Sequence, residues 1–202
     1  PSGKVLDVGA GSGAMLAAVS AACPQWKLFG QDLDARKEPA LRAIRGFERL
    51  FTMPPAEIGE RFDLVTLVHS LEHFTEPLAM LRGLKACLKP GGRLFVQVND
   101  VERMPFDLVV ADHLCHFTPA SLAFLAGQAG FGSRAFDWVR KEISLLCSPQ
   151  ENLAHARAAP GRLPVLLPPQ RHPRRGAARA REGGWPVRGP HPHEVHLGIR
   201  AG

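Results

Sequence analysis

Short apolar runs alternate with amphipathic stretches through the first 150 residues of the chain. Buried strands are predicted for the runs at 4–8, 26–30, 48–52, 62–68 and 93–98. Helices are predicted for 14–22, 39–44 and 76–88, and for a segment that begins at Pro119 and ends near Gly130. Strands that alternate with helices predict an α/β fold, a Rossmann-like doubly wound and mostly parallel sheet with helices on both faces.

The end of this region has a different pattern. Residues 134–139 and 142–147 are apolar runs separated by a short polar turn, which predicts a hairpin. A hairpin at the end of a parallel sheet adds one antiparallel strand. We therefore expect one domain over residues 1–150 that closes with an antiparallel strand.

Charge and composition divide the chain at about residue 150. Residues 1–150 hold 16 Lys and Arg against 16 Asp and Glu, whereas residues 151–202 hold nine Arg and three Glu and carry the whole net charge of +6. This second part contains eight prolines and seven glycines and shows no regular period. We interpret 151–202 as a low-complexity tail, disordered or arising from a shifted reading frame; the alternative is an arginine-rich arm that binds nucleic acid.

No apolar run reaches the roughly 20 residues that a membrane span needs. The four cysteines are far apart in sequence and form no CxxC pair, which indicates neither a disulfide framework nor a zinc framework. These two features favour a cytoplasmic location.

A glycine turn lies between the first predicted strand and the first predicted helix, in the segment VLDVGAGSGA at 5–14. Glycines allow a tight turn and let a ligand approach the backbone without a Cβ in the way. The helix that follows presents free N–H groups. Gly9, Gly11 and Ala14 also satisfy the dinucleotide pattern GxGxx(G/A), so the turn alone leaves the ligand open.

Two acidic residues near this turn indicate which class of ligand it binds. Asp7 lies two residues before Gly9, where a carboxylate suits a cationic group such as an amino-acid ammonium better than a pyrophosphate. Asp32 follows the second strand, where a carboxylate can accept hydrogen bonds from both ribose hydroxyls. We interpret its neighbour Asp34 as a solvated loop acid.

Four segments in order then resemble the motifs of one family. They are VLDVGAGSG (5–13), GQDLD (30–34), FDLVTLVHSLEHFTEP (62–77) and LKACLKPGGRLFVQV (84–98). Together they look like class I S-adenosylmethionine (SAM) dependent methyltransferases, most closely those of ubiquinone and menaquinone biosynthesis and of other small molecules. The resemblance covers about residues 3–148 and implies SAM as cofactor and a seven-stranded sheet whose last strand is antiparallel.

The resemblance also implies roles for individual residues. Asp7 and the turn formed by Gly9, Ala10, Gly11 and Gly13 would hold the methionine part of SAM. Asp32 would hold the ribose and Leu33 would lie along the adenine. The residues just after the fourth strand would line the pocket near the sulfonium: His69, Ser70 and Leu71.

The chain departs from the family in two places. Relatives often have an acid after the third strand that meets the adenine amino group, but residues 51–56 read FTMPPA and the nearest acid is Glu57. The first strand begins within four residues of the N-terminus. We therefore expect the helices that cover the SAM pocket in relatives to be missing, which puts the activity of this exact chain in question.

Two histidines precede the last predicted helix, in the segment DHLCHFTP at 112–119. The resemblance and the position of this loop make His113 and His116 candidate general bases. The alternative is that both rings order the loop through hydrogen bonds. No third ligand is evident beside the HxxH pair, so no metal site is predicted. His73 is interpreted as a residue that packs and caps between strand and helix.

Together these features favour methyl transfer from SAM to a small-molecule or glycan-related acceptor. The neutral body and the absence of an Asn-Pro-Pro-Tyr-like motif argue against a nucleic-acid substrate. Two alternatives stay open: an NAD-type nucleotide-binding oxidoreductase, and an inactive or truncated SAM-binding module. The sequence specifies neither the methylated atom nor the oligomeric state.

Overall fold

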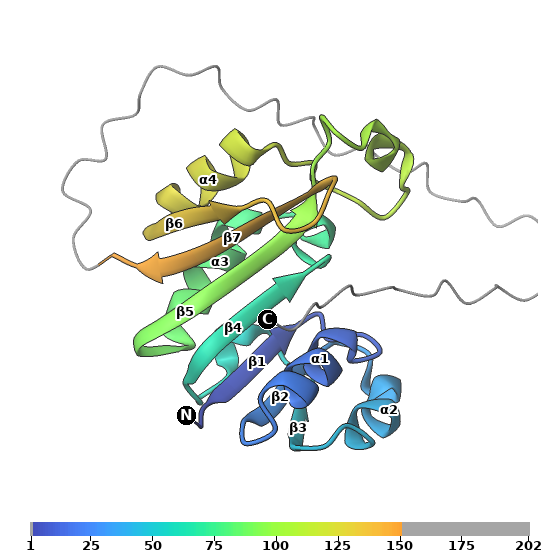
Figure 1. Cartoon of the computed structure of the whole chain (residues 1–202), viewed down its shortest axis with the longest axis vertical. Coiled ribbons are helices and arrows are strands. Elements are labelled where there is room, and N and C mark those ends of the chain that lie inside the picture. Colours follow the sequence, from blue (N-terminus) through green and yellow to red (C-terminus); the bar gives the residue numbers. More distant parts are fainter. Residues whose placement is uncertain (1, 151–202) are drawn as a thin grey trace, which may run out of the picture. The chain divides into compact units, whose positions relative to one another are not determined.

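The computed structural model describes residues 2–150 (Figure 1). In this part, the strands are β1 (Lys4–Val8), β2 (Lys27–Gln31), β3 (Phe47–Phe51), β4 (Phe62–Val68), β5 (Leu88–Asn99), β6 (Phe131–Phe136) and β7 (Glu142–Pro149). The α-helices are α1 (Ala14–Ala22), α2 (Glu38–Arg42), α3 (Pro77–Ala86) and α4 (Pro119–Gln128). Short 3-10 turns are η1 (Ala35–Lys37), η2 (Pro55–Glu57), η3 (Leu71–His73) and η4 (Pro105–Val109). The predicted tail, 151–202, lies outside the described residues.

The strands form one sheet in the order β3-β2-β1-β4-β5-β7-β6. Neighbouring strands from β3 to β5 pair in parallel, whereas β7 is antiparallel to both β5 and β6. This confirms the predicted doubly wound sheet with its last strand antiparallel. The predicted hairpin is also confirmed, and its second strand lies between β5 and β6.

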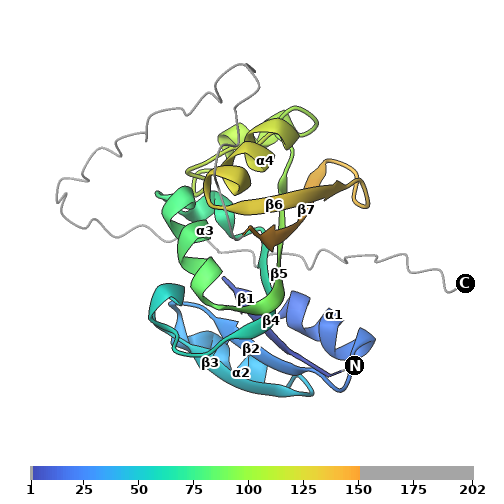
Figure 2. The same ribbon diagram turned by 90° about the vertical axis from the view of Figure 1, so that its left-hand side faces the viewer.

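Helices cover both faces of the sheet, as predicted. The apolar cores place α1 and α2 on one face and α3 and α4 on the other, and Figure 2 shows α1 and α3 on opposite sides of the sheet. Each face has its own apolar core; Leu16 of α1 and Leu41 of α2 lie in one, and Leu81 of α3 and Leu122 of α4 lie in the other. A strand buried on both faces needs a continuous apolar run such as FDLVTLV in β4, which explains why that strand was evident from sequence.

The start of β5 differs from the prediction. The helix was expected to reach residue 88 and the strand to begin at 93, but α3 ends at Ala86 and β5 begins at Leu88. Phe62 of β4 pairs with Leu88 while Leu64 pairs with Arg93, so the intervening Lys-Pro-Gly-Gly segment bulges out of the ladder. The Pro-Gly-Gly sequence therefore marks a bulge inside a strand rather than a loop before it.

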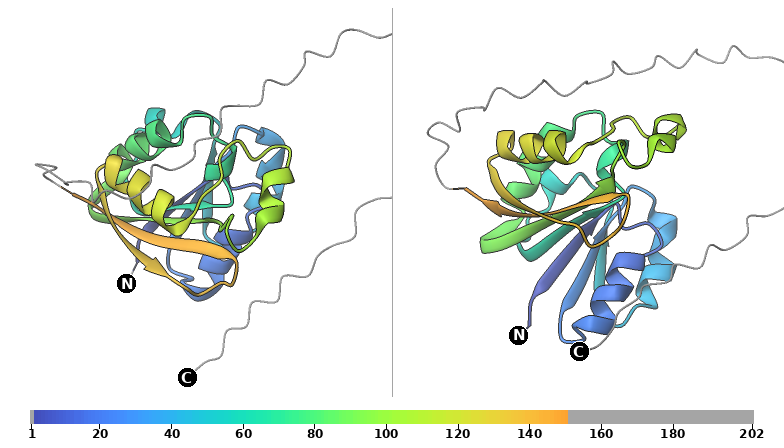
Figure 3. Two further views of the ribbon diagram at one scale, coloured as in Figure 1. Left: turned by 90° about the horizontal axis from the view of Figure 1, so that it is seen from above. Right: turned by 45° about the horizontal axis from the view of Figure 1, so that its top comes forward.

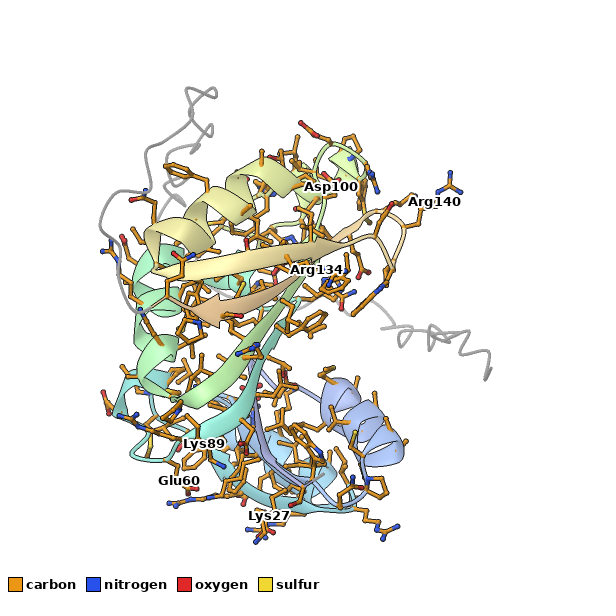
Figure 4. The ribbon with its side chains drawn as sticks, turned by 60° about the vertical axis from the view of Figure 1, so that its left-hand side comes forward. Lys27, Glu60, Lys89, Asp100, Arg134 and Arg140 are labelled. Carbon is orange, nitrogen blue, oxygen red and sulfur yellow. The ribbon has the colours of Figure 1, made fainter. Side chains whose placement is uncertain are left out.

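The parallel strands point their carboxyl ends toward one edge of the sheet. In Figure 4, Asp100 lies at this edge, just after β5, whereas Lys27, Glu60 and Lys89 lie at the amino edge. The segment between β5 and α4 extends beyond the carboxyl end of β5 (Figure 3). Adjacent strands β1 and β4 lead to helices on opposite faces, so this edge contains the switch point at which α/β sheets bind ligands. Within residues 2–150, no helix has both the length and the apolar character of a membrane span.

The loop after β5 is fixed where it enters α4. The Thr118 hydroxyl accepts a hydrogen bond from the backbone N–H of Ser121 at 3.2 Å, and the Ser121 hydroxyl oxygen accepts one from the Thr118 N–H at 2.9 Å. This capping box lies at the start of α4, which begins at Pro119 as predicted, and it fixes the exit of the histidine-containing loop.

Candidate functional site

The turn between β1 and α1 has three glycines in the left-handed region. Their φ angles are 75° for Gly9, 51° for Gly11 and 85° for Gly13. A Cβ on Gly9 would lie 2.6 Å from the Cβ of Ser70, and one on Gly13 would lie 2.5 Å from Cδ1 of Ile44. Beside Gly11 the nearest atom would be a carbonyl oxygen at 3.9 Å. Close packing therefore requires two of the glycines, and the third leaves bare backbone beside open space.

The same turn is tied to the end of β2. The carbonyl of Gln31 accepts hydrogen bonds from the N–H groups of Gly9 (2.8 Å) and Ala10 (3.0 Å). Asp32 Oδ2 accepts one from Gly11 N–H at 2.9 Å, and Oδ1 accepts one from Asp34 N–H at 2.9 Å. Each carboxylate oxygen has a second lone pair that can accept from a ribose hydroxyl. Sequence did not identify Gln31 because it acts through its backbone carbonyl.

Asp7 is buried at the end of β1 beside this turn. The Thr66 hydroxyl donates a hydrogen bond of 2.6 Å to its Oδ1. Burial raises the pKa of Asp7 from 3.8 to about 7, and the bond from Thr66 opposes only part of that rise. A nearby cation would hold Asp7 in its charged form. Thr66 was not predicted, because its place beside Asp7 depends on the register of β1 against β4.

The other expected cofactor residues differ in exposure. Leu33 follows β2 with 75% of its surface exposed, so its side chain is free to lie along a flat ring. The Ser70 hydroxyl donates to the Val8 carbonyl at 2.8 Å, and Leu71 is fully buried in a core. Of the three residues expected after β4, only His69 presents a partly exposed side chain, 41%.

His69 lies between two carboxylates. Its Nδ1 is 3.6 Å from Glu72 Oε1 and its Nε2 is 3.4 Å from Glu142 Oε1. The nearby carboxylates of Glu72, first, and Glu142 raise the pKa of His69 against the effect of burial. The backbone of His69 is left-handed, with φ of 49°, a conformation that costs a non-glycine residue free energy and is typical of functional sites. Glu72 is fully buried, and its Oε2 has no hydrogen-bond partner among residues 2–150.

A buried carboxylate in η4 holds the two predicted histidines. Asp107 Oδ1 lies 2.8 Å from Nδ1 of His113, and Oδ2 lies 2.8 Å from Nδ1 of His116. Asn99, the last residue of β5, donates to Asp107 Oδ1 at 2.6 Å. Burial opposes the charge of Asp107, but these hydrogen bonds and the charge of His113 hold its pKa below the usual value. No sequence pattern linked Asp107 to the HxxH pair, because the link requires the 3-10 turn.

Backbone and side-chain contacts join the histidine loop to the residues after β4. The N–H groups of Leu114 and Cys115 donate to the Glu72 carbonyl at 2.8 and 3.1 Å. Asn99 contacts the carboxylates of both Asp107 and Glu72. Its side-chain amide donates to Asp107 Oδ1, and its backbone N–H donates to Glu72 Oε1 at 3.3 Å. His73 Nδ1 lies 2.9 Å from the Asp112 carbonyl, so this ring links η3 to the loop, in agreement with its predicted packing role. Acid and imidazole groups from η3, η4 and the loop before α4 are thus gathered around Asn99 of β5.

The site therefore has two parts on either side of the switch point. The glycine turn, Asp7 and Asp32 form a part that suits an adenosyl amino acid. The second part has His69, Glu72 and the Asp107–histidine cluster, whose groups can accept protons. The acid that relatives place after β3 is replaced here by the η2 turn, where Glu57 lies.

Three comparisons place this geometry among known proteins. A family model described as "Methyltransferase domain" matches residues 1–133. The chain is 31% identical over 128 residues to the ubiquinone biosynthesis O-methyltransferase of Idiomarina loihiensis, an alignment that covers 57% of this chain and 51% of that protein. The chain thus spans about half the length of this relative.

Two solved structures show the same fold. An O-methyltransferase family protein from Burkholderia thailandensis has a TM-score of 0.62 and 21% identity, over 73% of this chain and 51% of that one. An O-methyltransferase of neocarzinostatin biosynthesis, solved with SAM and 2-hydroxy-5-methyl naphthoic acid, has a TM-score of 0.62 and 22% identity, over 73% and 49%. Because the family model matches well over half of the sequence, this chain belongs to the methyltransferase domain family.

Proposed function

We propose that this chain binds SAM and transfers its methyl group to a hydroxyl group of a small-molecule acceptor. The observation that carries the proposal is the turn from Gly9 to Gly13, tied through Gly11 N–H to the carboxylate of Asp32 and lying beside the buried Asp7. Hydroxyl acceptors are supported by relatives whose names are O-methyltransferases.

Each residue of the first part has a role in the proposed cofactor site. Asp32 accepts the ribose hydroxyls through the lone pairs that the Gly11 and Asp34 N–H groups leave free. The exposed Leu33 covers the adenine. Asp7 becomes ionised when the ammonium of the methionine part approaches the turn, because an opposite charge favours the charged form of a carboxyl group. Gly11 provides the open backbone along which the methionine part lies.

The second part prepares the acceptor. The acceptor oxygen attacks the methyl carbon in line with the carbon–sulfur bond, the new C–O bond forms as the C–S bond breaks, and S-adenosylhomocysteine leaves. The acceptor proton must go to a base or to solvent as the oxygen reacts. His113 and His116 are the proposed activating residues, with Asp107 fixing the orientation of both rings. His69, held between Glu72 and Glu142, is a further imidazole that could receive the proton.

Calorimetric titration tests the cofactor directly. The full chain is titrated separately with S-adenosylhomocysteine and with NAD at pH 8. The proposal predicts 1:1 binding of S-adenosylhomocysteine and at least tenfold weaker binding of NAD. Tighter binding of NAD would support the oxidoreductase alternative, and binding of neither would overturn the proposed SAM site.

The remaining expectations are part of the same proposal. The small-molecule acceptor and the exclusion of nucleic acid by the neutral body stay predictions, as does the cytoplasmic location inferred from the cysteine spacing. The acceptor of this chain is a separate question from that of its relatives, because the chain spans only about half their length.

A further inference from the structure

Asp107, His113 and His116 form a compact group of potential metal ligands. One ligand atom from each lies within 4.8 Å of the other two. The group is largely shielded from solvent, since the side chains of Asp107, His113 and His116 are 1%, 10% and 17% exposed. A second set of three, formed by His73, Asp112 and His113, shares one of the rings.

The two sets differ in how firmly their members are held. In the set that contains His73, Asp112 is 77% exposed and His73 is 39% exposed, so one side chain is mostly and another partly in solvent. Asp107 accepts hydrogen bonds from Asn99 and from both rings, so its carboxylate is already held in position. The loop that supplies both rings is held at the Glu72 carbonyl and at the Thr118 cap. The Asp107 set is therefore the better organised site.

The distances fit a small cation after a minor rearrangement. Each Nδ1 lies 2.8 Å from a carboxylate oxygen. Ligand atoms that share a tetrahedral Zn²⁺ with bonds of about 2.0 Å are about 3.3 Å apart. Binding would therefore require each pair to separate by about half an ångström, with loss of the ring proton that now lies between the nitrogen and the oxygen.

We propose that Asp107, His113 and His116 bind a divalent first-row transition metal ion, with Zn²⁺ as the representative ion. Two imidazoles and one carboxylate suit Zn²⁺, Co²⁺ or Ni²⁺, whereas Mg²⁺ prefers oxygen ligands and retains its waters. Three protein ligands leave one coordination position open, which is the pattern of catalytic rather than structural zinc sites.

The open position gives the site a use in methyl transfer. An ion held by Asp107, His113 and His116 would act as a Lewis acid toward a hydroxyl group of the acceptor and would ease the loss of its proton to solvent during methyl transfer. The metal then supplies the activation that the two rings provide in its absence. This use rests on the proposed function, whereas metal binding itself rests only on the geometry of the three side chains.

The test must separate this site from the histidines of the tail. The sequence has nine histidines, of which five lie at positions 155, 172, 191, 193 and 196. The background protein is therefore the full chain, untagged, with these five replaced by glutamine. It is titrated with Co²⁺, followed by visible absorption, and with Zn²⁺ and Mg²⁺ by calorimetry. We expect one Co²⁺ and one Zn²⁺ per chain and no heat from Mg²⁺.

Two substitutions of the same type locate the ion. His116→Gln removes a ligand of the Asp107 set, and His73→Gln removes a ligand of the other set. We expect the first to weaken Zn²⁺ binding at least tenfold and the second to leave it unchanged. The reverse order would move the ion to the His73 set, and equal affinity in all three proteins would exclude both sets; either result overturns the proposal.

X-ray absorption of the Zn²⁺-loaded His73→Gln protein covers the case in which His116→Gln does not fold, because the His73 set then keeps only one imidazole. The proposal predicts two imidazole ligands in this protein, and fewer than two contradicts it. Titration of the background protein with S-adenosylhomocysteine, with and without Zn²⁺, tests the proposed function separately. Cofactor binding without metal binding would refute only the metal site, and metal binding without cofactor binding would refute only the SAM site.

Discussion

Replacing Asp7 with asparagine should change how the stability of the protein depends on pH. Burial raises the pKa of Asp7 from 3.8 to about 7 in the folded protein. A carboxyl group with a raised pKa contributes its stability fully below the unfolded value, and that stability is lost as the pH rises through the folded value. The protein without ligand should therefore lose stability from this group between about pH 4 and pH 7.

The size of the effect follows from the two pKa values. At 1.36 kcal/mol for each pKa unit, the raised pKa of Asp7 lowers the free energy of unfolding by about 1.7 kcal/mol at pH 5 and by about 4.3 kcal/mol at pH 8, because Asp7 ionises more readily in the unfolded chain. Asparagine keeps an oxygen that can accept the hydrogen bond from Thr66 but cannot ionise. The free energy of unfolding of Asp7→Asn, relative to the unsubstituted protein, should therefore rise by about 3 kcal/mol from pH 5 to pH 8.

Urea denaturation of both proteins at pH 5 and pH 8 measures this difference. Asp63→Asn is the matched control, because the hydrogen bond from Lys89 lowers the pKa of Asp63 and its stabilising effect is already complete above pH 5. The difference in the free energy of unfolding between Asp63→Asn and the unsubstituted protein should therefore be the same at pH 5 and pH 8. If the Asp7→Asn difference is also constant, Asp7 is not the buried titrating group described above.

Further changes test other parts of the structure. Gly13→Ala should destabilise the protein by about 2 kcal/mol or more in urea denaturation, because its φ is 85° and its Cβ would lie 2.5 Å from Ile44. Gly11→Ala, which meets open space, should cost less stability; an equal loss would contradict the packing difference between the two glycines. Thr118→Ala should cost about 1 kcal/mol because the capping box is lost, and an unchanged urea midpoint would argue against it. The thiol of Cys147, whose pKa burial raises to about 12, should not react with a thiol reagent at pH 8 until the protein unfolds; rapid labelling of the folded protein would exclude its burial.

Local sequence patterns predicted most of the fold. The apolar runs of β1 and β4, the glycine turn and the Thr118-Pro119 helix start each depend on neighbours within a few residues, so their type and position were evident. The predicted helix at 76–88 and strand at 93–98 leave the Pro-Gly-Gly segment between them. It lies inside β5, because pairing with β4 on both sides of the bulge outweighs the local turn preference.

The site was predictable where its chemistry is local and not where it depends on tertiary contacts. Asp32 is predicted from its place after the second strand, and its hydrogen bond from Gly11 agrees with that position. Ser70 packs against Gly9 across 61 positions of the sequence, and Thr66 reaches Asp7 only through strand register. Asp107 joins two histidines through a 3-10 turn that has no clear sequence signal. Contacts of this kind require the folded chain.

The central claim is that the Gly9–Gly13 turn and Asp32 bind an adenosyl amino acid, and one pair of titrations tests it. Asp32→Ala removes the carboxylate that meets Gly11, whereas Asp34→Ala removes a neighbouring acid that caps η1 and pairs with Arg36. Calorimetry with S-adenosylhomocysteine should show at least a tenfold loss of affinity for Asp32→Ala and little change for Asp34→Ala. If Asp32→Ala binds as tightly as the unsubstituted chain, the cofactor does not lie at this turn.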